Sequence, residues 1–264
     1  TLKKDVPVKN KISEFELKEI DKNKLYNFLR EMEFNRLLSS VISTYGEVEF
    51  LSKTKVFDKE EKNHKISNKN YELIEKEEDI DKWLNEAEER GEIAVDTETS
   101  SLDPHQAKLV GISFSTKIGK ACYIPIGHTE GKNLEEKKVI KKIKPVLEDK
   151  SIKKIGQNIK FDYIIFYHKG INMNAMEDTM LMSYVLDAGK NRHNMDVLSE
   201  IHLDHKTIAF KDLVGTGKKQ INFSEVKIDI AKDYAAEDAD ITFRLYKIFS
   251  KNLKLKKLLN IYEI

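Results

Sequence analysis

Two carboxylates, Asp96 and Glu98, stand at the end of residues 92–95 (EIAV), a segment with the composition of a buried strand. Strands disfavour Asp, and protein interiors rarely hold Asp or Glu without a partner. Because side chains alternate along a strand, both carboxylates point to the same side and repel each other. A divalent cation removes that repulsion, and oxygen ligands without sulfur or imidazole nearby favour magnesium or manganese over zinc. Alone, the pair fits an exposed strand end as well as a metal site.

Further acidic and phenolic side chains recur later in the chain. Asp162 stands in GQNIKFDY, at the start of a predicted helix that follows a short strand. Tyr234 and Asp238, in YAAEDAD, are four residues apart and therefore share one face of the last predicted helix. Taken singly, Asp162 also fits a helix cap, and Tyr234 fits a core residue with a hydrogen-bonded hydroxyl. Glu237 and Asp240 lie elsewhere on that helix, and we predict surface or capping roles for them.

Hydrophobic periodicity indicates the elements that must position these side chains. It predicts strands in YELIE, EIAVDTE, KLVGISFST, ACYIPI and KKIGQN. It predicts helices in DIDKWLNEAEER, in NLEEKKVIKKIKPVLEDK with Asn133 as its cap, in KFDYIIFYHK, MEDTMLMSYVLD and NMDVLSEIHL, and over residues 229–253. Three successive strands followed by helices and a further strand predict an α/β fold, in which a mixed sheet is flanked by helices.

The first part of the chain has a different character. Residues 1–45 are predicted to form a small, self-contained helical segment, with Asp21 as a helix N-cap. Residues 46–64 are polar, rich in lysine and without periodicity, which is typical of a flexible linker. The main domain is predicted to cover residues 65–264.

Composition excludes several classes of protein. The 264 residues include one cysteine, Cys122, so neither an intramolecular disulfide nor a cysteine zinc cluster can form. The 46 basic and 45 acidic residues give a net charge of +1, which argues against a protein that simply coats nucleic acid. Neither a membrane-spanning apolar run nor a signal-peptide core is present, and we expect a cytoplasmic protein that does not contact a membrane.

The order of the three acidic motifs, D-x-E, then N-x-x-x-D, then Y-x-x-x-D, resembles the DEDD superfamily of 3′→5′ exonucleases, in its tyrosine-bearing branch. The segments VDTETSSLD, KIGQNIKFD, RHNMDVLSE, HKTIAFKDLVGTGKKQINF and YAAEDADIT are similar to the proofreading domain of the bacterial DNA polymerase I (family A) polymerases. This resemblance covers about residues 65–264. LYNFLREMEFNRLL resembles the end of the 5′-nuclease domain that precedes it there. The resemblance therefore implies a fragment without its polymerase domain.

The resemblance implies a ribonuclease H-like fold and two divalent cations, Mg²⁺ or Mn²⁺, in the catalytic site. Asp96, Glu98 and Asp238 would hold the first cation. Asp96 would bridge to the second, which Asp162 would support partly through water. Tyr234 would orient the attacking water, because a phenol titrates near ~10 and is a weak base.

The resemblance also implies contacts with single-stranded or frayed DNA 3′ ends. Leu102 and Phe210 correspond to apolar wedges around the terminal bases, and Gln157, Asn158 and Arg192 correspond to residues that contact the strand. Leu102 and Phe210 also fit ordinary core positions, and Arg192 fits a partner for an acid. The further partner would be the polymerase domain of the full-length protein, and we expect a monomer.

Two other functions stay open from the sequence. One is a ribonuclease D-like 3′→5′ exoribonuclease, which shares the same metal chemistry and differs in how it treats the 2′-hydroxyl. The other is a catalytically silent domain that only holds DNA. The presence of all five acidic and phenolic residues favours an active exonuclease used in DNA replication and repair.

Overall fold

The computed structural model describes residues 19–32, 34–46 and 69–263, together with the isolated residues 5, 7 and 16. The chain divides into two compact units, Thr1–Glu61 and Lys62–Ile264. Apart from Gly46, the predicted linker of residues 46–64 lies outside the described residues.

In the first unit, two helices, α1 (Lys22–Glu31) and α2 (Asn35–Tyr45), pack against each other. Asp21 caps α1 as predicted, since its carboxylate accepts a hydrogen bond of 3.1 Å from the backbone N–H of Lys24. Tyr26 is buried, and its hydroxyl donates to the carbonyl of Gly46 at 2.6 Å, which ties α1 to the end of α2.

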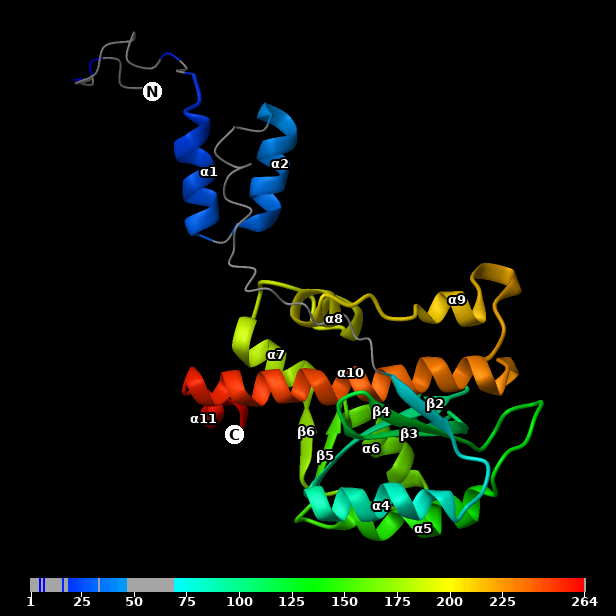
Figure 1. Ribbon diagram of the computed structural model, residues 1–264. Coiled ribbons are helices and arrows are strands. Elements are labelled where there is room, and N and C mark those ends of the chain that lie inside the picture. Colours follow the sequence, from blue (N-terminus) through cyan, green and yellow to red (C-terminus); the bar gives the residue numbers. More distant parts are fainter. Residues whose placement is uncertain are drawn as a thin grey trace. The chain divides into compact units, whose positions relative to one another are not determined.

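The second unit contains a mixed sheet in the order β1-β4-β3-β2-β5-β6 (Figure 1). The central strand β3 is antiparallel to both of its neighbours, β2 and β4, whereas the pairs β1–β4, β2–β5 and β5–β6 are parallel. The strand bounds are β1 Asn70–Leu73, β2 Glu92–Thr99, β3 Leu109–Lys117, β4 Lys120–Pro125, β5 Lys153–Gly156 and β6 Met176–Asp178. The predicted mixed sheet flanked by helices is confirmed.

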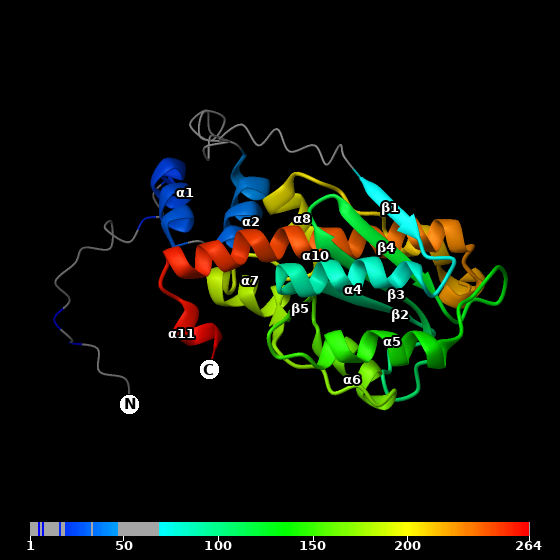
Figure 2. The same cartoon turned by 60° about the horizontal axis from the view of Figure 1, so that its bottom comes forward.

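Helices cover both faces of this sheet (Figures 1 and 2). One face packs against α4 (Asp79–Arg90), α5 (Glu136–Glu148) and α6 (Lys160–His168). The other face packs against α10 (Ile228–Leu255), with α7 (Thr179–Asp187) and α8 (Met195–Leu203) beside it. Two short helices, α9 (Phe210–Val214) and α11 (Leu259–Tyr262), also belong to the second unit, and α9 contacts α10. None of the described helices is long and apolar enough to cross a membrane.

Residue size explains how closely α10 approaches the sheet. Its first half buries the small side chains of Ala231, Ala235 and Ala239. Its second half buries larger ones, such as Phe243 and Phe249. Small side chains let a helix backbone approach a strand closely, so the first half of α10 can bring its polar side chains against β2.

Two predicted details of the elements are wrong. Asn133 does not cap α5, which begins three residues later; its side chain instead accepts from the backbone N–H of His128 at 2.9 Å and donates to the carbonyl of that residue at 2.8 Å. Residues 176–178, predicted as helix, form strand β6 and pair with β5, and Asp178 caps α7. The Asn133 side chain is thus engaged by the preceding turn, whereas β6 forms because β5 lies beside it.

Candidate active site

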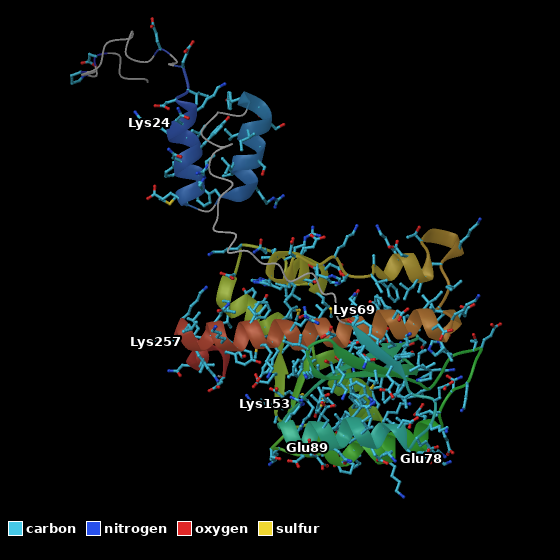
Figure 3. All side chains as sticks on the ribbon, in the orientation of Figure 1. Lys24, Lys69, Glu78, Glu89, Lys153 and Lys257 are labelled. Carbon is cyan, nitrogen blue, oxygen red and sulfur yellow. The ribbon has the colours of Figure 1, made fainter. Side chains whose placement is uncertain are left out.

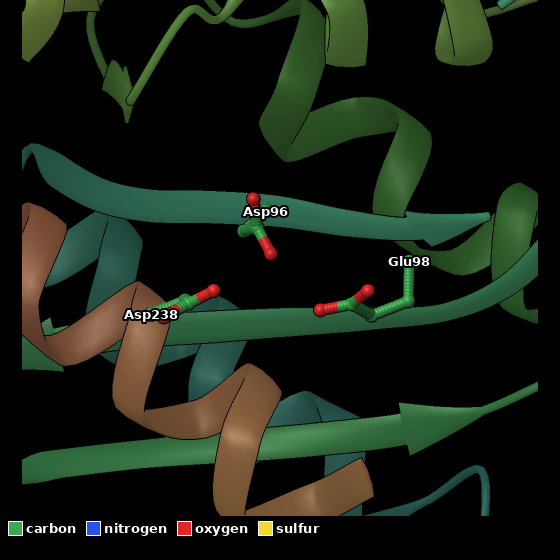
Figure 4. Close-up of side chains that lie close together, drawn as sticks. All are labelled: Asp96, Glu98 and Asp238. Carbon is green, nitrogen blue, oxygen red and sulfur yellow. The ribbon is translucent and has the colours of Figure 1, made fainter. Parts of the chain in front are cut away.

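Three carboxylates meet between the central strand and the long helix. Asp96 and Glu98 belong to β2, and Asp238 belongs to the first half of α10. One oxygen from each lies within 4.8 Å of the other two. Figure 4 shows the three side chains pointing into one space between the strand and the helix. The alternation of β2 puts Ala94 against α10, and therefore Asp96 and Glu98 face the same helix.

Asp162 joins this group from the first turn of α6, where its side chain is only 3% exposed. One of its oxygens, Oδ1, accepts two hydrogen bonds from Thr97: 2.9 Å from the backbone N–H and 2.6 Å from the hydroxyl. Thr97 lies between Asp96 and Glu98 and points to the opposite side of β2, which faces α6. The sequence reading overlooked Thr97, although its place between the two acids indicates which side it faces.

The electrostatics of the group favour a bound cation. Burial raises the pKa of Asp96 to about 6. Burial, followed by repulsion from neighbouring carboxylates, also raises the pKa of Glu98, Asp162 and Asp238 well above their usual range. The described residues that line the surrounding cleft include no Lys, Arg or His to compensate these charges. Four crowded oxygen donors without a basic partner fit a hard divalent cation.

Tyr234 stands one turn before Asp238 on α10, so its hydroxyl lies near that carboxylate, and the two groups affect each other's pKa. Burial and then the charges of Asp238, Glu98 and Asp96 raise the pKa of the Tyr234 phenol far above its usual value. The phenol therefore stays protonated at neutral pH and acts as a hydrogen-bond donor and acceptor, rather than as a base.

The carboxylates lie in a cleft of about 620 Å³, and most of the predicted substrate contacts line it. Leu102 is 93% exposed at the rim, and Phe210 is 42% exposed. The Phe210 ring is stacked on Phe223, with centroids 6.1 Å apart, and packs against Tyr234 at 6.0 Å. Neither Leu102 nor Phe210 is an enclosed core residue, and both present apolar surface to the cleft.

Gln157 and Asn158 line the cleft just after β5. The Gln157 amide is held at both ends: it donates to the carbonyl of His193 at 2.8 Å and accepts from the Thr179 hydroxyl at 2.5 Å. Asn158 has a positive φ of 59°, and its backbone N–H donates to Asp178 at 3.0 Å. The Asp178 carboxylate also accepts from the backbone N–H of Ile159 at 3.2 Å, immediately before α6, and so holds the turn that leads to Asp162.

One predicted contact lies elsewhere. Arg192 is exposed in the connection between α7 and α8, and it is not among the described residues that line the cleft. The cleft also includes a wall that the sequence reading missed, residues 220–223. Asn222 in this wall donates to the carbonyl of Ser100 at 2.7 Å and so connects it to the loop that carries Leu102.

The surface or capping roles predicted for Glu237 and Asp240 are wrong. Glu237 is 1% exposed and Asp240 is fully buried. Both carboxylates are satisfied by donors from distant parts of the chain, which include Lys69 for Glu237 and Tyr71 for Asp240. A charged residue tolerates burial when such partners surround it, and the local sequence does not reveal them.

The fold of the second unit has known counterparts. The structure is similar to that of Escherichia coli RNase D, an exoribonuclease, with a TM-score of 0.56 and 15% sequence identity; the match covers 73% of this chain and 48% of that chain. At this level of identity the likeness shows the fold alone, which is the ribonuclease H-like α/β fold of such exonucleases.

Sequence comparison is more specific. A family model described as the 3′-5′ exonuclease of family A DNA polymerases matches residues 71–254. DNA polymerase I of Rhizobium leguminosarum is 40% identical over 70% of this chain, and that of Pseudomonas aeruginosa is 35% identical over 96% of it. The chain belongs to this family of 3′-5′ exonucleases. It spans 20% and 28% of the length of these two relatives.

Proposed function

We propose that this chain removes nucleotides from DNA 3′ ends by metal-assisted hydrolysis, as the proofreading part of a DNA polymerase I that acts in replication and repair. The observation that carries the proposal is the convergence of Asp96, Glu98, Asp162 and Asp238 in one cleft with Tyr234. The full-length protein would also contain the polymerase domain, with the first 45 residues as the end of its 5′-nuclease domain. A cytoplasmic monomer fits this role.

Each carboxylate has a distinct place in the proposed mechanism. Asp96, Glu98 and Asp238 would hold one divalent cation, and Asp96 and Asp162 would hold a second; both would be Mg²⁺ or Mn²⁺. When bound, two such cations activate water and stabilise the leaving oxygen of a phosphodiester. The protonated Tyr234 hydroxyl, which lies beside Asp238, would orient the attacking water by a hydrogen bond.

The remaining residues would hold the end of the strand. Leu102 and Phe210 expose apolar surface on which terminal bases can pack, and such contacts do not depend on base identity. The fixed amide of Gln157 and the neighbouring Asn158 would contact the strand inside the cleft. Arg192 would contact a phosphate farther along the strand, because it lies outside the cleft.

An RNA substrate is the second candidate, since E. coli RNase D has the same fold. The metal site cannot distinguish the two substrates, because hydrolysis of a phosphodiester requires the same groups in both. The match to the exonuclease of DNA polymerases, at up to 40% identity over most of the chain, favours DNA.

The test uses a single-stranded DNA oligonucleotide labelled at its 5′ end, incubated with the purified chain and Mg²⁺ or Mn²⁺. We expect a ladder that shortens from the 3′ end, and we expect EDTA, Asp96→Ala and Asp162→Ala each to abolish it. Glu89→Ala serves as the matched control, because Glu89 is exposed on α4, on the face of the sheet opposite α10 (Figure 3).

An RNA oligonucleotide of the same sequence is tested in parallel. Faster digestion of the RNA would replace the DNA proposal with the RNA one. A folded chain that digests neither substrate, although it binds metal, would indicate the silent domain. Cleavage by Asp96→Ala at the parental rate would show that the carboxylate site is wrongly assigned.

A further inference from the structure

Glu237 precedes Asp238 on α10 but faces a different part of the molecule. Its carboxylate is 1% exposed and accepts three hydrogen bonds. The donors are the Lys69 ammonium at 2.5 Å, the His205 Nε2 at 3.0 Å and the backbone N–H of Ile208 at 2.7 Å. The last two donors belong to one segment, residues 205–209, which connects α8 to α9.

This connecting segment has no regular secondary structure and leads directly to Phe210, the first residue of α9. It lies along α10 between α8 and α9 (Figure 1). Besides the two bonds to Glu237, side-chain hydrogen bonds hold it at its beginning and its middle. The Ser199 hydroxyl donates to the carbonyl of His205 at 2.8 Å, and Thr207 donates to Asp196 at 2.7 Å. Among the described residues, the bond from the backbone N–H of Ile208 to Glu237 is the last of these anchors before Phe210.

The same stretch of α10 holds Phe210 from a second side. Tyr234, one turn before Glu237, packs its ring against that of Phe210, with centroids 6.0 Å apart. Three nearby residues of α10 therefore have different roles. Asp238 belongs to the acidic cluster, Tyr234 contacts both that cluster and Phe210, and Glu237 fixes the backbone two residues before Phe210.

We propose that Glu237 is a positioning residue, which fixes the segment of residues 205–209 so that Phe210 keeps its place at the cleft beside the acidic cluster. The proposal deepens the proposed function and rests on it, because Phe210 matters only if it packs against the end of a nucleic acid strand. Glu237 itself touches neither the substrate nor the metals. Its ion pair with Lys69 adds a connection to the residue immediately before β1 (Figure 3).

The chain offers a matched control on the same helix. Asp240 is also fully buried, and it accepts from the Tyr71 hydroxyl at 3.0 Å, the backbone N–H of Gly119 at 2.7 Å and Arg244 Nε at 3.0 Å. These partners anchor β1 and the turn between β3 and β4, rather than the Phe210 segment. Like Glu237→Gln, Asp240→Asn removes a buried carboxylate from α10, but it should not loosen residues 205–209.

The first experiment does not depend on the substrate. Amide hydrogen exchange is followed by mass spectrometry in the whole chain, in Glu237→Gln and in Asp240→Asn. We expect the peptides that cover residues 205–212 to exchange at least about tenfold faster in Glu237→Gln and at the parental rate in Asp240→Asn. Equal exchange of this segment in Glu237→Gln and the parent would overturn the proposal, whether or not the chain cleaves DNA.

The second experiment connects Glu237 to Phe210. KM and kcat for single-stranded DNA are measured for Glu237→Gln, Phe210→Ala and the double variant. We expect each single variant to raise KM by up to about tenfold with kcat within about twofold, the size of one lost stacking contact. The double variant should have the same KM as Phe210→Ala alone. In contrast, Asp240→Asn should change KM by the same factor in the parent and in Phe210→Ala. Independent, multiplying effects of Glu237→Gln and Phe210→Ala would overturn the proposal.

His205→Ala replaces Glu237→Gln if the latter does not fold, since it removes one of the two bonds to the segment and leaves Glu237 in place. It should also speed the exchange of residues 205–212 and raise KM only when Phe210 is present, although both effects should be smaller. Parental exchange together with a parental KM would overturn the proposal. A parent chain without activity on DNA, combined with faster exchange in the variants, would refute the proposed function and leave the positioning role standing.

Discussion

Thr97 donates both its backbone N–H and its hydroxyl to the same oxygen, Oδ1, of Asp162. The residue that separates Asp96 from Glu98 thus holds the carboxylate that arrives from another element. Because Oδ1 has two donors, the orientation of the Asp162 carboxyl group is set by β2, the strand that carries the other acids. These two hydrogen bonds therefore fix the position of α6 relative to β2 at the site itself.

We predict that Thr97→Val lowers exonuclease activity about tenfold or more, because a hydrogen bond to a charged group contributes about 1.5–3 kcal/mol. Thr97→Ser keeps the hydroxyl and should restore most of the activity. The measurement is kcat on single-stranded DNA, together with the Mn²⁺ affinity from calorimetry. Thr242→Val is the control, since the Thr242 hydroxyl is buried without a partner among the described residues. Full activity of Thr97→Val would show that the backbone N–H alone orients Asp162.

We predict that the metal-free chain is less stable at pH 7.5 than at pH 5. Burial raises the pKa of Asp96 to about 6, whereas an unfolded Asp titrates near ~3.9. Between these values the folded state holds a proton that the unfolded state has released, so the stability contributed by protonation is lost as pH rises through about 6. Thermal unfolding in EDTA measures this change, and Asp96→Asn should reduce it.

Excess Mn²⁺ should raise the melting temperature more at pH 7.5 than at pH 5, since cation and protons compete for the same oxygens. The raised pKa values of Glu98, Asp162 and Asp238 act in the same direction. A melting temperature in EDTA that rises from pH 5 to pH 7.5, with Asp96→Asn showing the same slope, would contradict this account of the charges.

We predict that Leu102→Ala weakens substrate binding without changing stability. Leu102 is 93% exposed, so its removal should change the free energy of unfolding by less than about 0.5 kcal/mol. Phe210→Ala should cost about 1 kcal/mol of stability as well, because the ring packs on Phe223 and Tyr234. Melting temperatures and KM values for the two variants separate these effects. An equal loss of stability in both would show that Leu102 packs against the protein.

We predict that Gly111→Ala destabilises the fold by about 1–3 kcal/mol, the usual cost of overpacking a core. Gly111 pairs with Glu98 across β2 and β3, and a Cβ there would lie 2.1 Å from the hydroxyl oxygen of the buried Tyr123. Chemical denaturation measures the loss. A second change, Tyr123→Leu, removes the far end of the ring and should make Gly111→Ala less harmful. Unchanged stability of Gly111→Ala alone would mean that Tyr123 can move freely.

Local patterns were sufficient for much of the fold. The strand predicted at residues 92–98 and the helix that carries Tyr234 and Asp238 follow from periodicity, and alternation alone puts Asp96 and Glu98 on one side. β6 was missed because three residues become a strand only when β5 is beside them. The burial of Glu237 was missed because its donors Lys69 and Ile208 are 168 and 29 positions away in the sequence. The roles of the individual site residues stay predictions.

The length of α10 has a consequence for how the enzyme loses activity on heating. One uninterrupted helix of 28 residues carries Tyr234 and Asp238 in its first half and core residues such as Phe249 in its second half. Because it packs on strands β1 to β5 and on α7 and α8, we expect it to unfold together with the rest of the second unit. Loss of the positions of Tyr234 and Asp238 on this helix and loss of the native state should then be a single event. During reversible heating, the fraction of activity that remains should therefore equal the fraction of molecules that remain folded.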